Sequence, residues 1–391
     1  MANCIEMPAP LHILTVIGAR PQIIKAAAIS SAVRTKFQGR ITETLLHTGQ
    51  HYDPNMSQVF FDELGIPPAD ISLGVGSGAH GVQTARMIEG IERELQVGKY
   101  DVVLLYGDTN STLAGAVAAA KLHIPVAHVE AGLRSFNKAM PEEINRIVCD
   151  HCSTWLFCPT ETAVKNLGRE GFALGTDAPA TVDKPHVVAS GDVMYDNSMR
   201  FAALAGQRSS ILTDLGLKED GFMLATVHRD HNTDDAARLN AIFGALLGMH
   251  RRHALPVVLP VHPRTRKMME SLLATDLKQA MASTKGFHLI PPVGFLDMIA
   301  LERNAKLVIT DSGGVQKEAY FFKRPVVVLR PETEWVELVE QGQAVLADAD
   351  PARIASAAET FIGHGVPQCP PIFGDGHAAE VICTKLLEAR G

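Results

Sequence analysis

Lys306-Leu-Val-Ile-Thr-Asp-Ser-Gly-Gly-Val-Gln-Lys-Glu318 is the stretch that decides the fold, because an apolar run passes directly into two glycines and then a helical pattern. A strand, a glycine turn and a helix N-terminus make an anion site. The glycines let the backbone approach a diphosphate, and the free N–H groups and dipole of the helix favour negative charge. Glu318 is then placed to accept hydrogen bonds from ribose hydroxyls. An ordinary β-to-α turn capped by Ser312 explains the same residues.

Apolar, β-branched runs alternate with helical patterns along the rest of the chain. Such alternation is typical of βαβ units on a buried parallel sheet. The predicted strands form two series. The first covers residues 12–17, 41–47, 102–106, 126–129, 156–158 and 187–189, and the second covers 222–227, 257–261, 287–290, 307–309, 326–329 and 344–346. The sequence therefore predicts an α/β protein with two Rossmann-like, doubly wound domains.

The length of 391 residues suits two domains, each able to bury its own core. We place the boundary near Gly191-Asp192, which gives a first domain over residues 1–190 and a second over 191–376. The final helix follows a stretch rich in proline and glycine, and we expect residues 377–391 to pack back on the first domain. Doubly wound sheets bind ligands at the carboxyl ends of their strands, so we expect the site in the cleft between the domains.

Composition indicates a soluble globular protein, with 46% hydrophobic and 20% charged residues. A net charge of −7 offers no basic surface for nucleic acid or an anionic membrane. No run reaches the roughly 18 apolar residues that span a bilayer, and the first residues lack the pattern of a secretory leader. We therefore expect a cytoplasmic protein with no nucleic-acid partner and no membrane partner.

The six cysteines are too few and too scattered for a disulfide framework, so we expect reduced thiols. Cys149-Asp-His-Cys152 has the spacing of half a zinc site. No second Cys/His pair at a suitable spacing follows it, and we expect no metal.

Acidic residues follow two predicted strands of the first domain. Asp108 and Glu130 each come directly after an apolar run, where a buried acid costs free energy that a function offsets. Glu142 and Glu143 begin a predicted helix, a position where carboxylates commonly complement the helix dipole. The residues alone therefore make Asp108 and Glu130 candidates for acid/base chemistry and favour a structural role for the Glu142-Glu143 pair.

Basic residues stand at the same ends of other predicted strands. Arg20 and Lys25 open the first helix, where they either neutralise a phosphate or carboxylate or are solvated cations of a capped helix. His228 and Arg229 follow the first strand of the second domain and point at the expected cleft. Two further candidates are Phe295, in a loop suited to a flat base, and Arg330, an additional cation.

Six motifs, in this order along the chain, resemble the non-hydrolysing UDP-N-acetylglucosamine 2-epimerases. They are Gly18-Ala-Arg-Pro-Gln22, Gly107-Asp-Thr109, His128-Val-Glu-Ala-Gly-Leu-Arg134, Pro141-Glu-Glu-Ile-Asn-Arg146, Thr226-Val-His-Arg229 and Asp311-Ser-Gly-Gly-Val-Gln-Lys-Glu318. The resemblance runs from Leu11 to about Leu346. It implies two Rossmann-like domains in a GT-B arrangement, a homodimer, and interconversion of UDP-GlcNAc and UDP-ManNAc for cell-envelope polysaccharide, with no cofactor.

The chemistry that this resemblance implies is an anti elimination followed by re-addition. The C2 proton is removed, UDP leaves C1 to give 2-acetamidoglucal, and UDP adds back after protonation on the other face. The resemblance assigns acid/base and cation-stabilising roles to Asp108, Glu130 and Glu142. It implies that His228 contacts the diphosphate. It also implies that UDP or the sugar is bound by Arg20, Lys25, Arg146, Ser312, Gly313, Gly314, Glu318 and Arg330.

Three segments depart from the family pattern. His228-Arg-Asp-His-Asn232 has His231 where the family has Glu, and Thr333-Glu-Trp-Val-Glu337 stands for Thr-Glu-Arg-Pro-Glu. Thr48-Gly-Gln-His-Tyr-Asp53 lacks the Gln-His-Arg pattern that resembles an allosteric substrate site of bacterial relatives, so activation by substrate is not expected from the sequence.

These variants leave several alternatives open. The Gly18 and Thr333 motifs are closer to a branch acting on UDP-2,3-diacetamido-2,3-dideoxyglucuronate, an O-antigen precursor. A GT-B glycosyltransferase would share the nucleotide motif but would not need three carboxylates from the first domain. A hydrolysing relative would release UDP and a free sugar, and a binding protein without activity would tolerate loss of Asp108 or Glu130.

Overall fold

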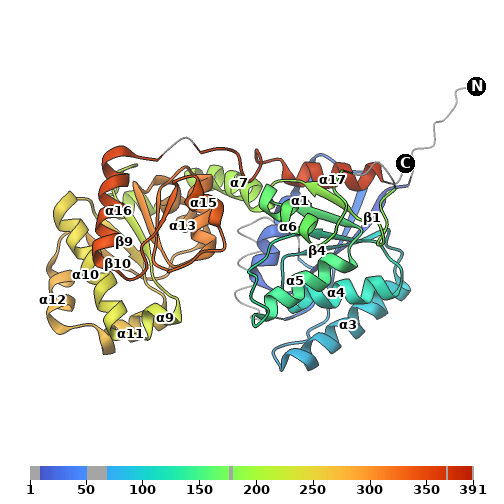
Figure 1. The fold of residues 1–391 in the computed structure, drawn as a ribbon, viewed down its shortest axis with the longest axis horizontal. Helices are drawn as coiled ribbons and strands as arrows, with labels where there is room; N and C mark the ends of the chain where they lie inside the picture. Colours follow the sequence, from blue (N-terminus) through green and yellow to red (C-terminus); the bar gives the residue numbers. More distant parts are fainter. Residues whose placement is uncertain (1–8, 51–67, 176–178, 367–368, 390–391) are drawn as a thin grey trace, which may run out of the picture. The chain divides into compact units, whose positions relative to one another are not determined.

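The computed structural model describes residues 9–50, 68–175, 179–366 and 369–389 (Figure 1). The chain divides into two compact units: unit 1 comprises Met1–Asn197 and Pro371–Gly391, and unit 2 comprises Ser198–Pro370. The division between Asn197 and Ser198 lies inside the helix Val193–Arg208. The boundary expected from the sequence, Gly191-Asp192, lies just before that helix. The start of that helix belongs to unit 1 because Asn197 Nδ2 donates to the Ile24 carbonyl at 2.6 Å.

Unit 1 is built on a seven-stranded parallel sheet with the order β3-β2-β1-β4-β5-β6-β7. Its strands are β1 (Leu11–Ile17), β2 (Ile41–His47), β3 (Ile71–Ser72), β4 (Val102–Tyr106), β5 (Val126–Val129), β6 (Trp155–Cys158) and β7 (His186–Ala189). Its helices are α1 (Arg20–Thr35), α3 (His80–Val97), α4 (Asn110–Lys121), α5 (Pro141–Cys152), α6 (Glu161–Arg169), the start of α7 (Val193–Arg208), and α17 (Ala378–Glu388).

Unit 2 repeats the plan on a six-stranded parallel sheet with the order β10-β9-β8-β11-β12-β13. Its strands are β8 (Met223–Thr226), β9 (Val257–Pro260), β10 (Phe287–Ile290), β11 (Leu307–Thr310), β12 (Val326–Val328) and β13 (Ala344–Leu346). After the end of α7, its helices are α8 (Ile211–Asp214), α9 (Asp230–Thr233), α10 (Ala236–His253), α11 (Pro263–Leu272), α12 (Thr275–Ser283), α13 (Phe295–Asn304), α14 (Gly313–Phe321), α15 (Val336–Glu340) and α16 (Pro351–His364).

The strand order confirms two doubly wound, Rossmann-like units. In unit 1 the order reverses between β1 and β4, and in unit 2 it reverses between β8 and β11. The central strands are mostly apolar because both faces of each sheet are covered; every residue of β4, for example, is buried. Ligands of such sheets bind beyond the carboxyl ends of the strands that flank the reversal.

Helix α17 brings the last described part of the chain back to unit 1, where it packs beside α1 (Figure 1). Its first turn is held by Asp196, which accepts the N–H groups of Ala378 at 3.1 Å and Ala379 at 2.8 Å. Ile382 and Leu386 of this helix are buried. Among the described residues, no helix combines the length and the apolar character needed to cross a membrane.

Candidate active site

Two acidic residues leave the sheet of unit 1 at the same edge. Strands β4 and β5 are neighbours, with Tyr106 paired to Val129, so the turns that follow them lie side by side. Asp108 follows Gly107, whose φ is +61°, and Glu130 itself has a φ of +73°. A left-handed backbone is unusual for a glutamate and is found mainly where the surrounding structure imposes it.

Glu130 forms an ion pair with Lys25 of α1. The side chains are only 14% exposed for Lys25 and 12% for Glu130, so the pair is mostly withdrawn from solvent. Gly107 lies against it, because a Cβ at this position would be 3.1 Å from Lys25 Nζ and 3.2 Å from Glu130 Oε2. A shielded ammonium group next to a carboxylate is an arrangement suited to moving a proton.

Asp108 forms an ion pair with Arg146 of α5, and Arg146 Nη1 also donates to Glu143 Oε2 at 2.6 Å. Burial opposes the charge of Arg146, but the carboxylates of Asp108 and Glu143 outweigh it and raise the pKa of this guanidinium. Asn145 Nδ2 donates to the Asp108 carbonyl at 2.9 Å. The first two turns of α5 therefore hold the Asp108 loop from its side chain and its backbone.

The adjacent glutamates at the start of α5 have different surroundings. Glu143 is 1% exposed and accepts the N–H groups of Ser135 and Phe136, each at 2.9 Å. Burial works to raise the pKa of Glu143, but these hydrogen bonds and Arg146 lower it below its usual value. Glu142 is exposed, and its side chain makes no hydrogen bond or ion pair among the described residues. Its acid/base role remains a prediction.

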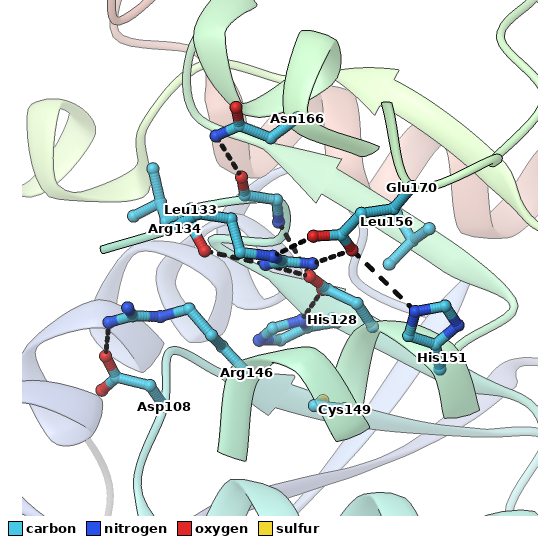
Figure 2. Close-up of polar contacts among 12 residues, drawn as sticks. Asp108, His128, Leu133, Arg134, Arg146, Cys149, His151, Leu156, Asn166 and Glu170 are labelled. Atoms are coloured by element: carbon cyan, nitrogen blue, oxygen red, sulfur yellow. Dashed lines mark hydrogen bonds and ion pairs between the residues drawn. The ribbon is translucent and has the colours of Figure 1, made fainter. Parts of the chain in front are cut away.

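A buried charge network lies close to these acids, and it contains none of the predicted site residues except Asp108 and Arg146 at its margin (Figure 2). His128 Nδ1 is 2.6 Å from Asp150 Oδ1, and Asp150 Oδ2 is 2.7 Å from Arg134 Nη1. Arg134 also binds Glu170 through two parallel N–H groups, both at 2.7 Å. The available signal was His128 itself, a polar residue inside an otherwise apolar four-residue strand.

Gln22 fixes the start of α1, which carries Arg20 and Lys25. Its Oε1 accepts the Gly18 N–H at 2.9 Å, and its Nε2 donates to the Tyr106 carbonyl at 2.9 Å. The side-chain placement predicted for Arg20 lies outside the described part of the structure, as does the segment from His51 to Asp53.

In unit 2, the glycine turn after β11 opens helix α14. Ser312 is the N-cap, and its Oγ accepts the Val315 N–H at 3.5 Å. Gly314 is exposed, and the nearest heavy atom to a Cβ there would be Ser312 Oγ at 3.8 Å. Gly313 is closed in, since its Cβ would lie 2.7 Å from Glu334 Oε1. The backbone is therefore approachable at Gly314 and covered at Gly313.

Asp311 organises the turn that carries His228. This fully buried carboxylate accepts the backbone N–H groups of His228 at 3.1 Å and Arg229 at 3.0 Å. His228 Nδ1 lies 3.3 Å from Asp311 Oδ1, and the His228 side chain is 44% exposed. Burial lowers the pKa of His228 although Asp311 acts in the opposite direction, so the ring is mainly neutral near pH 7.

The variant segment Thr333-Glu-Trp335 packs on the same turn. Trp335 Nε1 donates to the Gly313 carbonyl at 3.0 Å, and the Lys317 ammonium lies 4.5 Å from the Trp335 ring centroid. Thr333 Oγ1 donates to Gln316 Oε1 at 2.6 Å. Glu334 accepts from Arg330 at 2.7 Å, which brings that predicted cation to the turn. A departure from the family pattern therefore lies directly against the predicted nucleotide loop.

The remaining predicted residues are also in unit 2. Phe295, which was predicted to lie in a loop, is the first residue of α13 and packs edge-on against Phe201 with ring centroids 5.2 Å apart. Glu318 lies on α14 beside the buried carboxyl of Glu302. His231 is exposed. In the described ranges, no three His, Cys, Asp or Glu side chains come together as metal ligands.

Comparison with known proteins gives consistent similarities over almost the whole chain. A family model described as UDP-N-acetylglucosamine 2-epimerase matches residues 34–387. The chain is 48% identical over 379 residues to the UDP-2,3-diacetamido-2,3-dideoxy-D-glucuronate 2-epimerase of Pseudomonas aeruginosa, covering 97% of this chain and 100% of that protein. It is 38% identical to the UDP-N-acetylglucosamine 2-epimerase of Methanocaldococcus jannaschii, covering 94% and 96%. A crystal structure of the M. jannaschii enzyme with UDP-GlcNAc and UDP superposes with a TM-score of 0.78 at 37% identity, covering 97% of this chain and 100% of that one.

Proposed function

Because this chain belongs to the UDP-N-acetylglucosamine 2-epimerase family, we propose that it inverts C2 of a UDP-activated 2-acetamido sugar and retains the UDP group in the product. The observation that carries the proposal is the pairing of Asp108 and Glu130 with Arg146 and Lys25 at one edge of the unit 1 sheet. Oppositely charged partners let such groups exchange protons in a shielded site.

The proposed reaction uses both units. In unit 1, Asp108 and Glu130 transfer the C2 proton, and Glu142 serves as a third carboxylate. In unit 2, the open backbone at Gly314 and the N-terminus of α14 hold the diphosphate, while His228 and Arg330 stabilise the UDP that leaves C1. Glu318 receives the ribose hydroxyls.

For the sugar, we propose UDP-2,3-diacetamido-2,3-dideoxy-D-glucuronate. The P. aeruginosa relative that acts on this sugar is 48% identical over its full length. The Thr333-Glu-Trp335 variant lies against the nucleotide turn, where it is positioned to affect substrate choice. UDP-GlcNAc is the second candidate, because the 38% identical M. jannaschii relative is a UDP-N-acetylglucosamine 2-epimerase. Either product suits an envelope or O-antigen polysaccharide made in the cytoplasm.

Proton NMR in deuterium oxide tests the reaction and its substrate together. The protein is incubated separately with each of the two UDP-sugars. We expect the manno epimer, with deuterium at C2, to appear from the diacetamidoglucuronate and much more slowly from UDP-GlcNAc. The reverse preference would select UDP-GlcNAc, release of free UDP with a free sugar would indicate hydrolysis, and absence of C2 exchange in both tubes would refute the proposal.

Substitution of the paired acids tests their roles. Asp108→Asn and Glu130→Gln keep size and shape but remove the proton-accepting group, so each is expected to lower kcat by about 10²- to 10⁴-fold. UDP binding, which we assign to unit 2, should remain within about twofold of the native value. Calorimetry and the NMR assay measure the two quantities. Near-native turnover in either variant would remove that residue from the chemistry.

We also propose that the protein is a homodimer, as the family resemblance implies. Sedimentation equilibrium measures this directly. A single species with the mass of one chain at micromolar concentration would refute it.

A further inference from the structure

The hydrogen-bond partners of His128 fix its protonation state. Nε2 lies 2.8 Å from the Gly107 carbonyl oxygen, which can only accept, so Nε2 carries a proton. Nδ1 lies 2.6 Å from Asp150 Oδ1. Asp150 Oδ2 also accepts the Gly132 N–H at 3.2 Å and lies 2.7 Å from the Arg134 guanidinium. A carboxylate next to a guanidinium is ionised, and the proton of the short contact therefore belongs to the imidazole.

The groups that face the ring come from two segments. Cys149 and Asp150 face it from α5, and Arg134 reaches Asp150 from the segment after β5. Burial alone would lower the pKa of His128, but Cys149 and Asp150 outweigh it, and the pKa lies well above the usual value for histidine. The pKa of Asp150 is lowered in turn, because His128 and Arg134 outweigh its burial. Both shifts agree with the charge state that the hydrogen bonds require.

The ring also joins the two turns that carry the proposed acids. Gly107 immediately precedes Asp108, and His128 is two residues before Glu130. A peptide group is planar, so a hydrogen bond to the Gly107 carbonyl orients the whole Gly107–Asp108 peptide. The Gly107 N–H is held separately by the Val129 carbonyl at 3.0 Å. The ends of β4 and β5 are thus tied together on both sides of Gly107.

We propose that His128 is a permanently protonated positioning residue, whose bond to the Gly107 carbonyl sets the relative placement of the Asp108 and Glu130 carboxylates. The ring acts through the backbone, because its side chain is fully buried and both of its nitrogens are occupied. The positioning of two acids for proton transfer rests on the proposed epimerase function. The charge state of the ring does not.

Nitrogen-15 NMR of the ligand-free protein tests the charge state without any substrate. With the ring nitrogens of His128 assigned by comparison with a His128→Gln sample, we expect both to remain protonated from about pH 5.5 to pH 9, across the range in which an ordinary histidine loses its charge. Conversion to a neutral tautomer within this range would overturn the proposal.

Two matched variants test the positioning. The side-chain amide of His128→Gln reaches the place of Nε2 and keeps a donor for Gly107, whereas that of His128→Asn reaches the place of Nδ1 and keeps a donor for Asp150 only. We expect His128→Asn to lose about 100-fold in kcat with little change in KM, and His128→Gln to lose clearly less, since small misplacements of reacting groups have effects of this size. Equal losses of kcat, or losses expressed in KM, would overturn it.

The two tests distinguish failure of the positioning proposal from misfolding of a variant and from failure of the proposed function. Thermal unfolding of both variants identifies a variant that does not fold, and in that event the NMR titration of the native protein still decides the charge state. If the native protein exchanges no deuterium at C2 with either UDP-sugar, the proposed function fails while the titration result stands.

Discussion

At the residue scale, the buried carboxyl groups of Asp150 and Glu302 are accommodated in different ways. Asp150 is ionised and paired with two cations, so each charge compensates another. Glu302 on α13 is fully buried, and neither of its oxygens meets a hydrogen-bond donor among the described residues. Its carboxyl lies beside that of Glu318, and two carboxyls in contact are satisfied only if they share a proton.

This arrangement predicts a stability that depends on pH. Burial, together with Glu318, raises the pKa of Glu302 well above its usual value. The unfolded chain releases this proton near pH 4.3, whereas the folded chain retains it, so stability falls as pH rises from that value toward the raised pKa. We expect Glu302→Gln to be more stable than the native protein at pH 7.5 and to lose that advantage near pH 4.

Urea unfolding at the two pH values measures this effect. Glu270→Gln, which removes the same charge from an exposed position in α11, is the control. An advantage for Glu302→Gln that is the same at both pH values would contradict a shared proton.

At the element scale, the strands that could be predicted from the sequence are those that form an apolar run of several residues. The bounds predicted for β2, β4, β5, β10 and β13 agree with the structure. Strand β3 was not predicted, because a pair of residues, Ile71–Ser72, carries no periodic pattern. Asp108 and Glu130 were predicted as candidates because each directly follows such an apolar run. The contacts of Asn145 with the Asp108 carbonyl and of Asp150 with His128 were not predicted, since they form only when α5 packs on the sheet.

Helix α14 gives a prediction for the diphosphate. Gly314→Val adds a side chain at an exposed backbone position whose nearest neighbour would be 3.8 Å away, so the turn itself should tolerate it. A diphosphate on the same backbone would be displaced, and we expect UDP affinity to fall at least about tenfold, or 1.4 kcal/mol. Calorimetry measures the affinity.

The matched control is Gly248→Val, which changes another exposed glycine in α10 with no atom within 4 Å of the new Cβ. Gly313→Val is less informative, because its side chain would first meet Glu334 at 2.7 Å. Unchanged UDP affinity in Gly314→Val would move the diphosphate away from this turn.

At the scale of the whole molecule, one chain builds two units, each with an order reversal at the centre of its parallel sheet, and the last described helix belongs to the first unit. The contribution of α17 can be measured at Leu386, which is 2% exposed. Leu386→Ala leaves a cavity in unit 1 and is expected to lower the free energy of unfolding by about 2–5 kcal/mol. Val381→Ala, at a 36% exposed position of the same helix, should cost less than about 0.5 kcal/mol. Similar costs in urea unfolding would show that the buried face of α17 does not stabilise unit 1.

The return of α17 also sets an order of events during synthesis. Unit 2 is continuous in the chain from Ser198 to Pro370, so all of its residues can leave the ribosome and fold together. Unit 1 begins first but also includes residues from Pro371 onward, which are translated after unit 2. Until then its nascent sheet lacks the helix that covers α1, with the places of Ile382 and Leu386 open to water. A ribosome stalled anywhere in unit 2 would therefore display an unfinished first domain, a form that chaperones and proteases recognise by its uncovered apolar surface.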